Sequence, residues 1–163
     1  MWQMETFISD SIFHAYLISS KEDSCTMISI KEGYRSAVIY MLLKLMAADG
    51  HRDRAEYIYI IKVAHEMGMT HEEIVALGTQ DITSDPKLPG SERERMIILY
   101  YLLFMMKTDG LVSPEEEMLV KELGYTLGFR IEMVSELIQV IKSYDESTSP
   151  AEDLINKIRP YLN

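Results

Sequence analysis

The sequence predicts an all-α protein, a compact bundle of seven to eight helices with an internal duplication of a three-helix unit. Three observations support this prediction. Apolar residues recur with helical spacing, capping signals and glycines bound the segments, and the pattern repeats after 60 residues. No segment alternates between apolar and polar residues for long enough to favour a strand. With 163 residues, we expect a single domain over 1–163.

Helix starts are marked by a capping residue that is followed three positions later by Glu. Such a pair can satisfy backbone N–H groups that have no partner within the helix. Glycine marks the helix ends, because it readily adopts the left-handed conformation that often follows a helix. The capping pairs are Asp53/Glu56, Thr70/Glu73, Ser91/Glu94, Ser113/Glu116 and Ser149/Glu152, and the glycines are Gly50, Gly68, Gly110 and Gly128.

Eight helices are predicted between these signals. In chain order they cover 4–18, 33–49, 54–67, 70–79, 91–109, 114–127, 130–144 and 150–161. The segments 33–49 and 91–109 are almost entirely apolar, so we expect them to be central buried helices that include Leu43 and Leu103. The most apolar run, "MIILYYLLFMM", reaches only about half of the roughly 20 residues that a membrane crossing needs, so no membrane insertion is expected.

The two halves of the chain, about 33–79 and 91–144, resemble each other. An offset of 60 residues aligns 40–77 with 100–137, and most positions that are not identical exchange one apolar residue for another. We interpret this as two copies of a three-helix unit, joined by a proline-containing linker at 80–90. The identical pairs are Tyr40/Tyr100, Leu42/Leu102, Leu43/Leu103, Met46/Met106, Asp49/Asp109, Gly50/Gly110, Glu56/Glu116, Gly68/Gly128, Glu72/Glu132 and Leu77/Leu137.

The charge balance argues against two classes of partner. The chain carries 26 acidic and 16 basic residues, a net charge of -10, whereas nucleic acids and anionic membranes require clustered Lys and Arg. Cys25 is the single cysteine, which excludes an internal disulfide and fits a reducing compartment. The first residues show no basic stretch followed by an apolar run, so we expect a cytoplasmic protein.

Each half contains Asp-Gly followed by Glu seven residues after the Asp. The EF-hand shares this interval, but the first loop positions would be Leu45 and Met105, which offer no carboxylate to calcium. Capping accounts for the glutamates, but a carboxylate at the negative end of a helix dipole costs roughly 0.3–1 kcal/mol. Either N–H groups of the next helix or a bound cation would offset this cost. The sequence therefore leaves a structural role and a cation site as alternatives for the repeated Asp.

An apolar helix ending in "AADG" or "KTDG", then "SPEEE" and an apolar helix closing on Gly, resembles the tellurite-resistance TerB-like family over about 33–144. The resemblance implies a helical bundle, a stress-response role and an acidic cluster for a divalent metal. By position, the metal ligands would be Asp49, Glu56, Asp109 and Glu116. The first copy departs from the pattern, because His51 and Arg52 stand where the second copy has Leu111 and Val112.

Other chemistry finds little support in the sequence. His65 and His71 are six residues apart, which does not match the spacing of the zinc-protease motif. No nucleophile elbow or phosphate loop is present, so we expect a protein that is not an enzyme. Two functions remain: a non-catalytic TerB-like module that binds calcium, magnesium or manganese, or a helical interaction or scaffold protein without a metal site. A protein partner or a homodimer is expected in either case.

Overall fold

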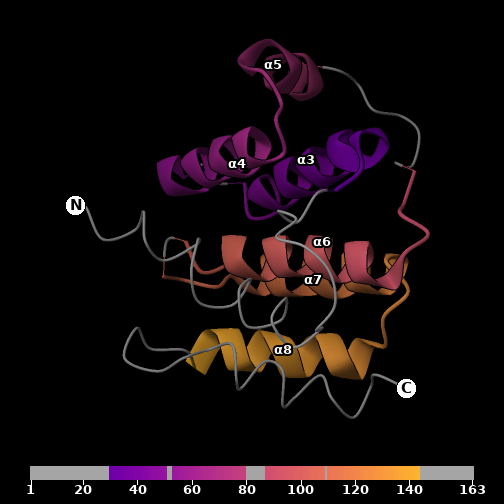
Figure 1. The fold of residues 1–163 in the computed structure, drawn as a ribbon. Coiled ribbons are helices and arrows are strands. Elements are labelled where there is room, and N and C mark those ends of the chain that lie inside the picture. Colours follow the sequence, from indigo (N-terminus) through magenta and orange to yellow (C-terminus); the bar gives the residue numbers. More distant parts are fainter. Residues whose placement is uncertain (1–29, 51–52, 80–86, 109, 144–163) are drawn as a thin grey trace. The chain divides into compact units, whose positions relative to one another are not determined.

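The computed structural model describes residues 30–50, 53–79, 87–108 and 110–143, and every regular element within these ranges is a helix (Figure 1). The helices are α3 (Glu32–Met46), α4 (Arg54–Glu66), α5 (His71–Thr79), α6 (Glu92–Met105), α7 (Pro114–Thr126) and α8 (Ile131–Ser143). The all-α prediction is confirmed for this part of the chain. The predicted helices 4–18 and 150–161 lie outside the described residues, so the total of seven or eight stays a prediction.

The chain divides into two compact units, Ile28–Ile131 and a second one made of Met1–Met27 and Glu132–Asn163. The first unit contains α3 to α7, including the helices α5 and α6 on either side of the predicted linker at 80–90. In the second unit the structure describes α8. Its buried residues recur along one face, as expected of an amphipathic helix, and they are Met133, Val134, Leu137, Ile138 and Ile141.

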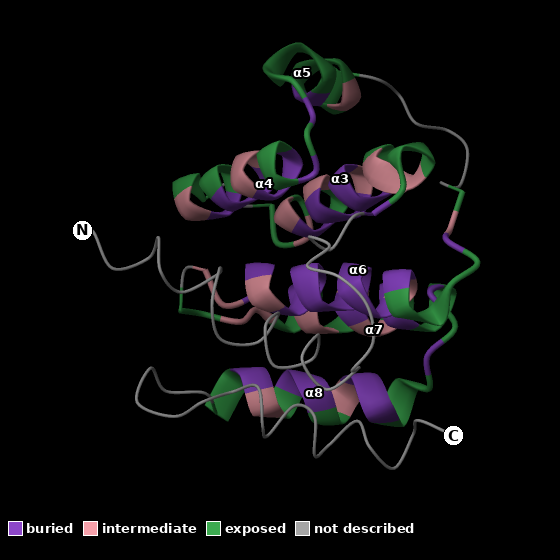
Figure 2. Ribbon diagram, in the orientation of Figure 1, coloured by how far each residue is buried: buried purple, intermediate pink, exposed green. Residues whose placement is uncertain are grey.

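Within the first unit, α3 and α6 form the centre. Helix α3 packs against α4, α5, α6 and α7, while α6 also contacts α4 and α7. Nearly every residue of α6 from Met96 onward is buried, and α3 buries one broad face (Figure 2). The prediction of two central helices in mutual contact is therefore confirmed. In the described residues, none of the helices combines the length and the apolar character that a membrane crossing requires.

Both central helices end earlier than predicted, at Met46 and Met105 instead of 49 and 109. Beyond these residues the backbone forms shorter-range turns, in which Ala48 N–H donates to the Leu45 carbonyl at 2.9 Å and Thr108 N–H to the Met105 carbonyl at 3.0 Å. The short turns let the chain reverse at Gly50, whose φ of 77° lies in the left-handed region. Asp49 consequently lies in a turn and not in the last turn of an α-helix.

One predicted core residue is less buried than expected. Leu103 of α6 is fully buried, with 0% of its surface exposed, but its partner by offset, Leu43 of α3, is half-buried. The reason is that α6 is buried almost all round from Met96 onward. Helix α3 buries one broad face and leaves its other side partly exposed, although it contacts four helices. The near-uniform apolarity of 33–49 therefore overstated the burial of that helix.

A buried hydrogen bond joins α4 to α6. The Tyr59 hydroxyl donates to the carbonyl oxygen of Tyr101 at 3.1 Å. Burial, followed by the neighbouring Tyr101, raises the pKa of Tyr59 well above its ordinary value. Tyr59 therefore remains a neutral donor, and we assign it a structural role.

The helix bounds repeat with the same offset that relates the sequences. Helices α6, α7 and α8 begin 60 residues after α3, α4 and α5. The glycines that follow α4 and α7, Gly68 and Gly128, also share a left-handed backbone, with φ of 76° and 89°. These agreements are local to each copy, and the duplication itself stays a prediction.

Candidate functional site

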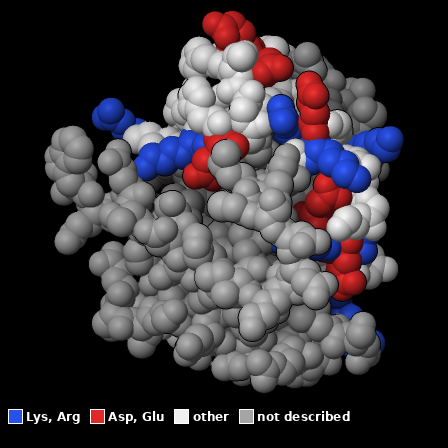
Figure 3. All heavy atoms as spheres, viewed as in Figure 1, with Lys and Arg blue, Asp and Glu red and all other residues white. Residues whose placement is uncertain are grey.

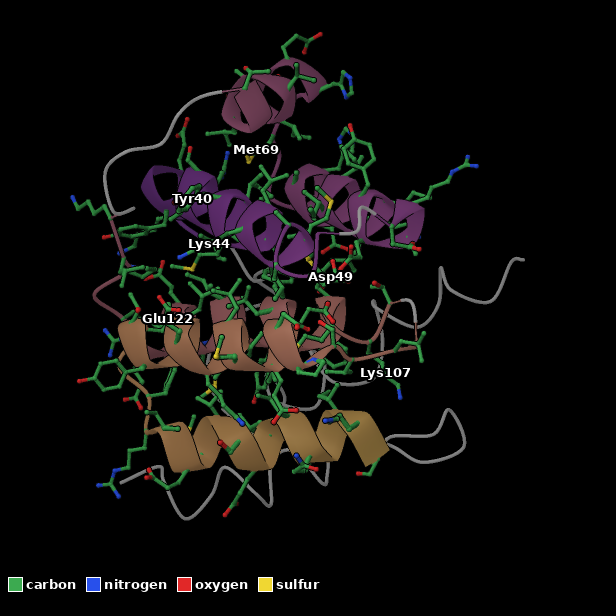
Figure 4. The ribbon with its side chains drawn as sticks, turned by 180° about the vertical axis from the view of Figure 1, so that it is seen from behind. Tyr40, Lys44, Asp49, Met69, Lys107 and Glu122 are labelled. Carbon is green, nitrogen blue, oxygen red and sulfur yellow. The ribbon has the colours of Figure 1, made fainter. Side chains whose placement is uncertain are left out.

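The residues predicted to bind metal lie in the two connections between an apolar helix and the helix that follows. Asp49 is exposed in the turn after α3, while Glu56 and Glu116 are buried in the first turns of α4 and α7. Asp109 lies outside the described residues. Figure 4 shows Asp49 at the end of α3, and Lys107 marks the corresponding turn after α6.

Glu116 belongs to a complete capping box at the start of α7. Its carboxylate accepts from Ser113 N–H at 2.7 Å, and its own N–H donates to the Ser113 hydroxyl at 3.1 Å. Pro114 occupies the first helical position, where its missing N–H leaves nothing unsatisfied. The carboxylate of Glu116 therefore stabilises the helix start, as its capping spacing predicts.

The other described capping pairs confirm the same principle with variations. Thr70 and Glu73 form a reciprocal pair, with Thr70 N–H donating to the Glu73 carboxylate at 2.7 Å. Asp53 caps α4 by accepting from Ala55 N–H. Glu94 instead accepts from Lys31 N–H at 3.5 Å, which connects the start of α6 to the start of α3. The pair Ser149/Glu152 lies outside the described residues.

The two connections lie at the same end of the first unit. Helices α3 and α6 run in the same general direction, and the chain leaves both at the left-hand side of Figure 1 before it enters α4 and α7. Each Asp-Gly sequence thus follows the same end of its apolar helix.

The described ligands do not form a metal site by themselves. Across residues 30–50, 53–79, 87–108 and 110–143, no three His, Cys, Asp or Glu side chains come together in a group that could hold a metal ion. Asp49, Glu56 and Glu116 are all within these ranges. A site built from the predicted residues therefore depends on Asp109.

Comparison with known proteins adds no assignment. Models of known protein families, curated protein sequences and solved structures all give no match to this chain. The TerB-like resemblance consequently rests on the acidic motif and the helical pattern alone.

Several exposed apolar residues were not singled out as functional by the sequence. Large exposed side chains occur on α4 and α7 and just before α7, and they include Tyr57, Ile58, Leu111, Met118 and Tyr125. The signal that could have found them is a departure from helical periodicity. In α7 the buried positions Val120 and Leu123 define the inner face, and the spacing of Met118 and Tyr125 places these two on the opposite side.

The outer ridge of α7 combines these apolar residues with acidic ones. Glu115, Met118, Glu122 and Tyr125 are all exposed, and their spacing places them within a sector of roughly 80° at 100° per residue. Figure 4 labels Glu122 on this helix. Lys121 lies beside the ridge and is paired with Glu117 at 2.7 Å.

The corresponding ridge of α4 has another character. Its residues at the same positions are Ala55, Ile58, Lys62 and His65, which include no carboxylate. On the face shown in Figure 3, acidic and basic side chains are interspersed. Compared with the α4 ridge, the α7 ridge stands out because it joins exposed apolar groups to negative charge alone.

Proposed function

We propose that this chain is a non-catalytic, TerB-like helical module that acts by binding a protein partner, in the cytoplasm and in a stress response. The observation that carries this proposal is the exposure of large apolar side chains on α4 and α7, namely Tyr57, Ile58, Met118 and Tyr125. Tyr and Met are enriched in protein interfaces. The TerB-like resemblance supports the stress-response context.

The two buried glutamates of the acidic motif, Glu56 and Glu116, support the same proposal. Glu116 forms a capping box, and Glu56 occupies the equivalent buried position in α4. A glutamate that stabilises a helix start needs no catalytic or metal-binding role to explain its presence. In this proposal the two glutamates stabilise the helix starts, and the exposed outer faces of α4 and α7 bind the partner.

Partner retention tests the proposed function. The tagged full chain would be purified from its own cells beside a variant with Tyr57→Ser, Ile58→Ser, Met118→Ser and Tyr125→Ser. We expect a protein retained by the parent chain and lost from the variant, while circular dichroism shows the same helix content in both. If both chains retain the same proteins, or neither retains any, the interaction proposal is wrong.

A divalent cation is a second candidate ligand, favoured by the Asp-Gly sequence that follows both α3 and α6, with Glu seven residues after each Asp. Asp49 and Asp109, with Glu56 and Glu116, would offer hard oxygen ligands that suit calcium, magnesium or manganese. A cation that binds only the folded chain raises its melting temperature. We expect this increase in the parent protein and its loss in the variant Asp49→Asn with Asp109→Asn. If none of the three cations changes the melting temperature of the parent, the acidic turns are structural.

A further inference from the structure

The outer ridge of α7, formed by Glu115, Met118, Glu122 and Tyr125, differs from an ordinary solvated helix face. Met118 is 70% exposed and Tyr125 is 67% exposed, and Leu111 just before the helix is 77% exposed. Isolated exposed apolar residues are normal, but large ones on one face, flanked by charges, indicate an interaction site.

The spacing of the two apolar residues on the ridge determines the spacing of apolar residues expected on a partner helix. Met118 and Tyr125 are two helical turns apart, which corresponds to about 10 Å along the axis. A partner helix whose apolar residues recur every two turns would place one side chain against each of them. Met is flexible enough to adapt to its neighbour, whereas Tyr offers a large rigid surface.

The negative charges on the ridge determine the sign of the charge that a partner surface should carry. Glu115 precedes Met118, and Glu122 lies between Met118 and Tyr125 along the same face. The one basic residue of α7, Lys121, already pairs with Glu117. A partner with Lys or Arg beside its apolar residues would therefore complement the ridge, and the net charge of -10 would attract such a partner from a distance.

Two other occupants fit the same ridge less well. A second copy placed with its own α7 against this one would bring Glu115 and Glu122 close to the same carboxylates of its neighbour, and like charges repel. An anionic membrane would be repelled for the same reason.

We infer that the outer ridge of α7 is the docking surface for a basic amphipathic helix of another protein. This inference rests on the proposed binding function and names the partner class for one of the two exposed surfaces. The apolar residues supply the contact area, and the carboxylates orient the partner and exclude acidic competitors.

A synthetic peptide tests this inference on the full chain. The probe is a helical peptide of about 15 residues with Leu recurring every two turns and Lys on both sides. One control peptide has Glu in place of Lys. Another has the same composition in an order that destroys the apolar stripe. Fluorescence anisotropy at an ionic strength of about 0.15 M measures the affinities.

We expect the Lys peptide to bind at least about tenfold more tightly than either control peptide. Met118→Ser and Tyr125→Ser should each weaken its binding by about tenfold, as is typical of central interface residues. Val75→Ser, which removes an apolar residue of α5 that is 47% exposed, is the matched control and should leave the affinity unchanged. Glu122→Gln should weaken binding and reduce its dependence on salt, because it removes one charge pair.

Four results would overturn the inference. The first is absence of binding, and the second is equal affinity for the peptide without the apolar stripe, which would indicate general charge attraction. The third is a loss with Val75→Ser as large as that with Met118→Ser. The fourth is self-association of the parent chain that Met118→Ser abolishes, since a second copy would then occupy the ridge. A partner retained from cells despite a failed peptide test would refute the α7 site and leave the proposed binding function intact.

Discussion

Helices α4 and α7 hold equivalent positions in the two halves, but they agree on their inner faces and differ on their outer ones. Glu56 and Glu116 are both buried in the first turn, and Ile60 and Val120 are both fully buried. Outside, α4 presents Ala55, Ile58, Lys62 and His65, whereas α7 presents Glu115, Met118, Glu122 and Tyr125. The inner positions are restricted by packing, so the two helices can differ more freely on their outer faces.

The connections that precede these helices differ in the same way. His51 and Arg52 precede α4, whereas Leu111 and Val112 precede α7. Leu111, which is 77% exposed, adds an exposed apolar residue just before α7. The second copy thus combines apolar and acidic residues, while the first combines apolar and basic ones.

The largest difference in unfolding free energy is expected between matching substitutions in the cores of the two halves. Leu103→Ala should cost about 2–5 kcal/mol of unfolding free energy, because Leu103 is fully buried and the substitution leaves a cavity. Leu43→Ala, at the equivalent position of half-buried α3, should cost less. Chemical denaturation of both variants measures these values. Equal losses would show that α3 and α6 are equally enclosed, contrary to the structure.

A smaller effect is expected at the two helix starts. Ser113→Ala removes the hydroxyl that accepts from Glu116 N–H, and it should cost about 0.5–2 kcal/mol. Asp53→Ala removes the acceptor of Ala55 N–H at the start of α4 and should cost a similar amount. Thermal or chemical unfolding compares the two. Ser113→Thr is the control, because Thr is also a good cap, and a loss as large as that of Ser113→Ala would argue against the capping role.

The smallest expected effect is a pH-dependent change in stability that comes from Glu66, the last residue of α4. Burial raises the pKa of Glu66 from its ordinary 4.5, and Lys62 partly opposes this increase. Since the folded chain favours the protonated form, the contribution of Glu66 to stability is complete below pH 4.5 and is lost as the pH rises through the raised pKa. Glu66→Gln should therefore become more stable relative to the parent as the pH rises through this range.

The equivalent residue of α7 provides the control for that experiment. Thr126 does not titrate, and its hydroxyl donates to the carbonyl of Glu122 at 3.0 Å. Thr126→Val should shift stability by the same amount at every pH. Unfolding midpoints measured from pH 4 to pH 7 for both variants test the assignment. A Glu66→Gln difference that does not change with pH would contradict it.

The fold could be predicted in most respects because its signals are local. Capping residues at Ser113 and Thr70 and the left-handed glycines at Gly68 and Gly128 locate the helix starts and ends to within one residue in most cases. The ends of α3 and α6 were wrong by three or four residues. Apolar residues such as Ala47 and Met106 continue the helical pattern, although the backbone has already entered a turn there.

The candidate site was harder to predict, because a motif does not state what its side chains contact. The sequence identified Glu116 as both a cap and a metal ligand, and only the structure shows its carboxylate accepting from Ser113 N–H. It also treated Leu43 and Leu103 alike, since burial depends on neighbours that are distant in the chain. Met118 and Tyr125 were overlooked because apolar residues in a helix are expected to face the core.

The central claim is that the module binds a partner through the outer ridge of α7. Amide hydrogen exchange of the full chain, alone and with the partner retained from cells, tests this claim most directly. The account predicts slower exchange over residues 111–126 in the complex than in the chain alone. Protection of 54–66 with no change over 111–126 would contradict the account.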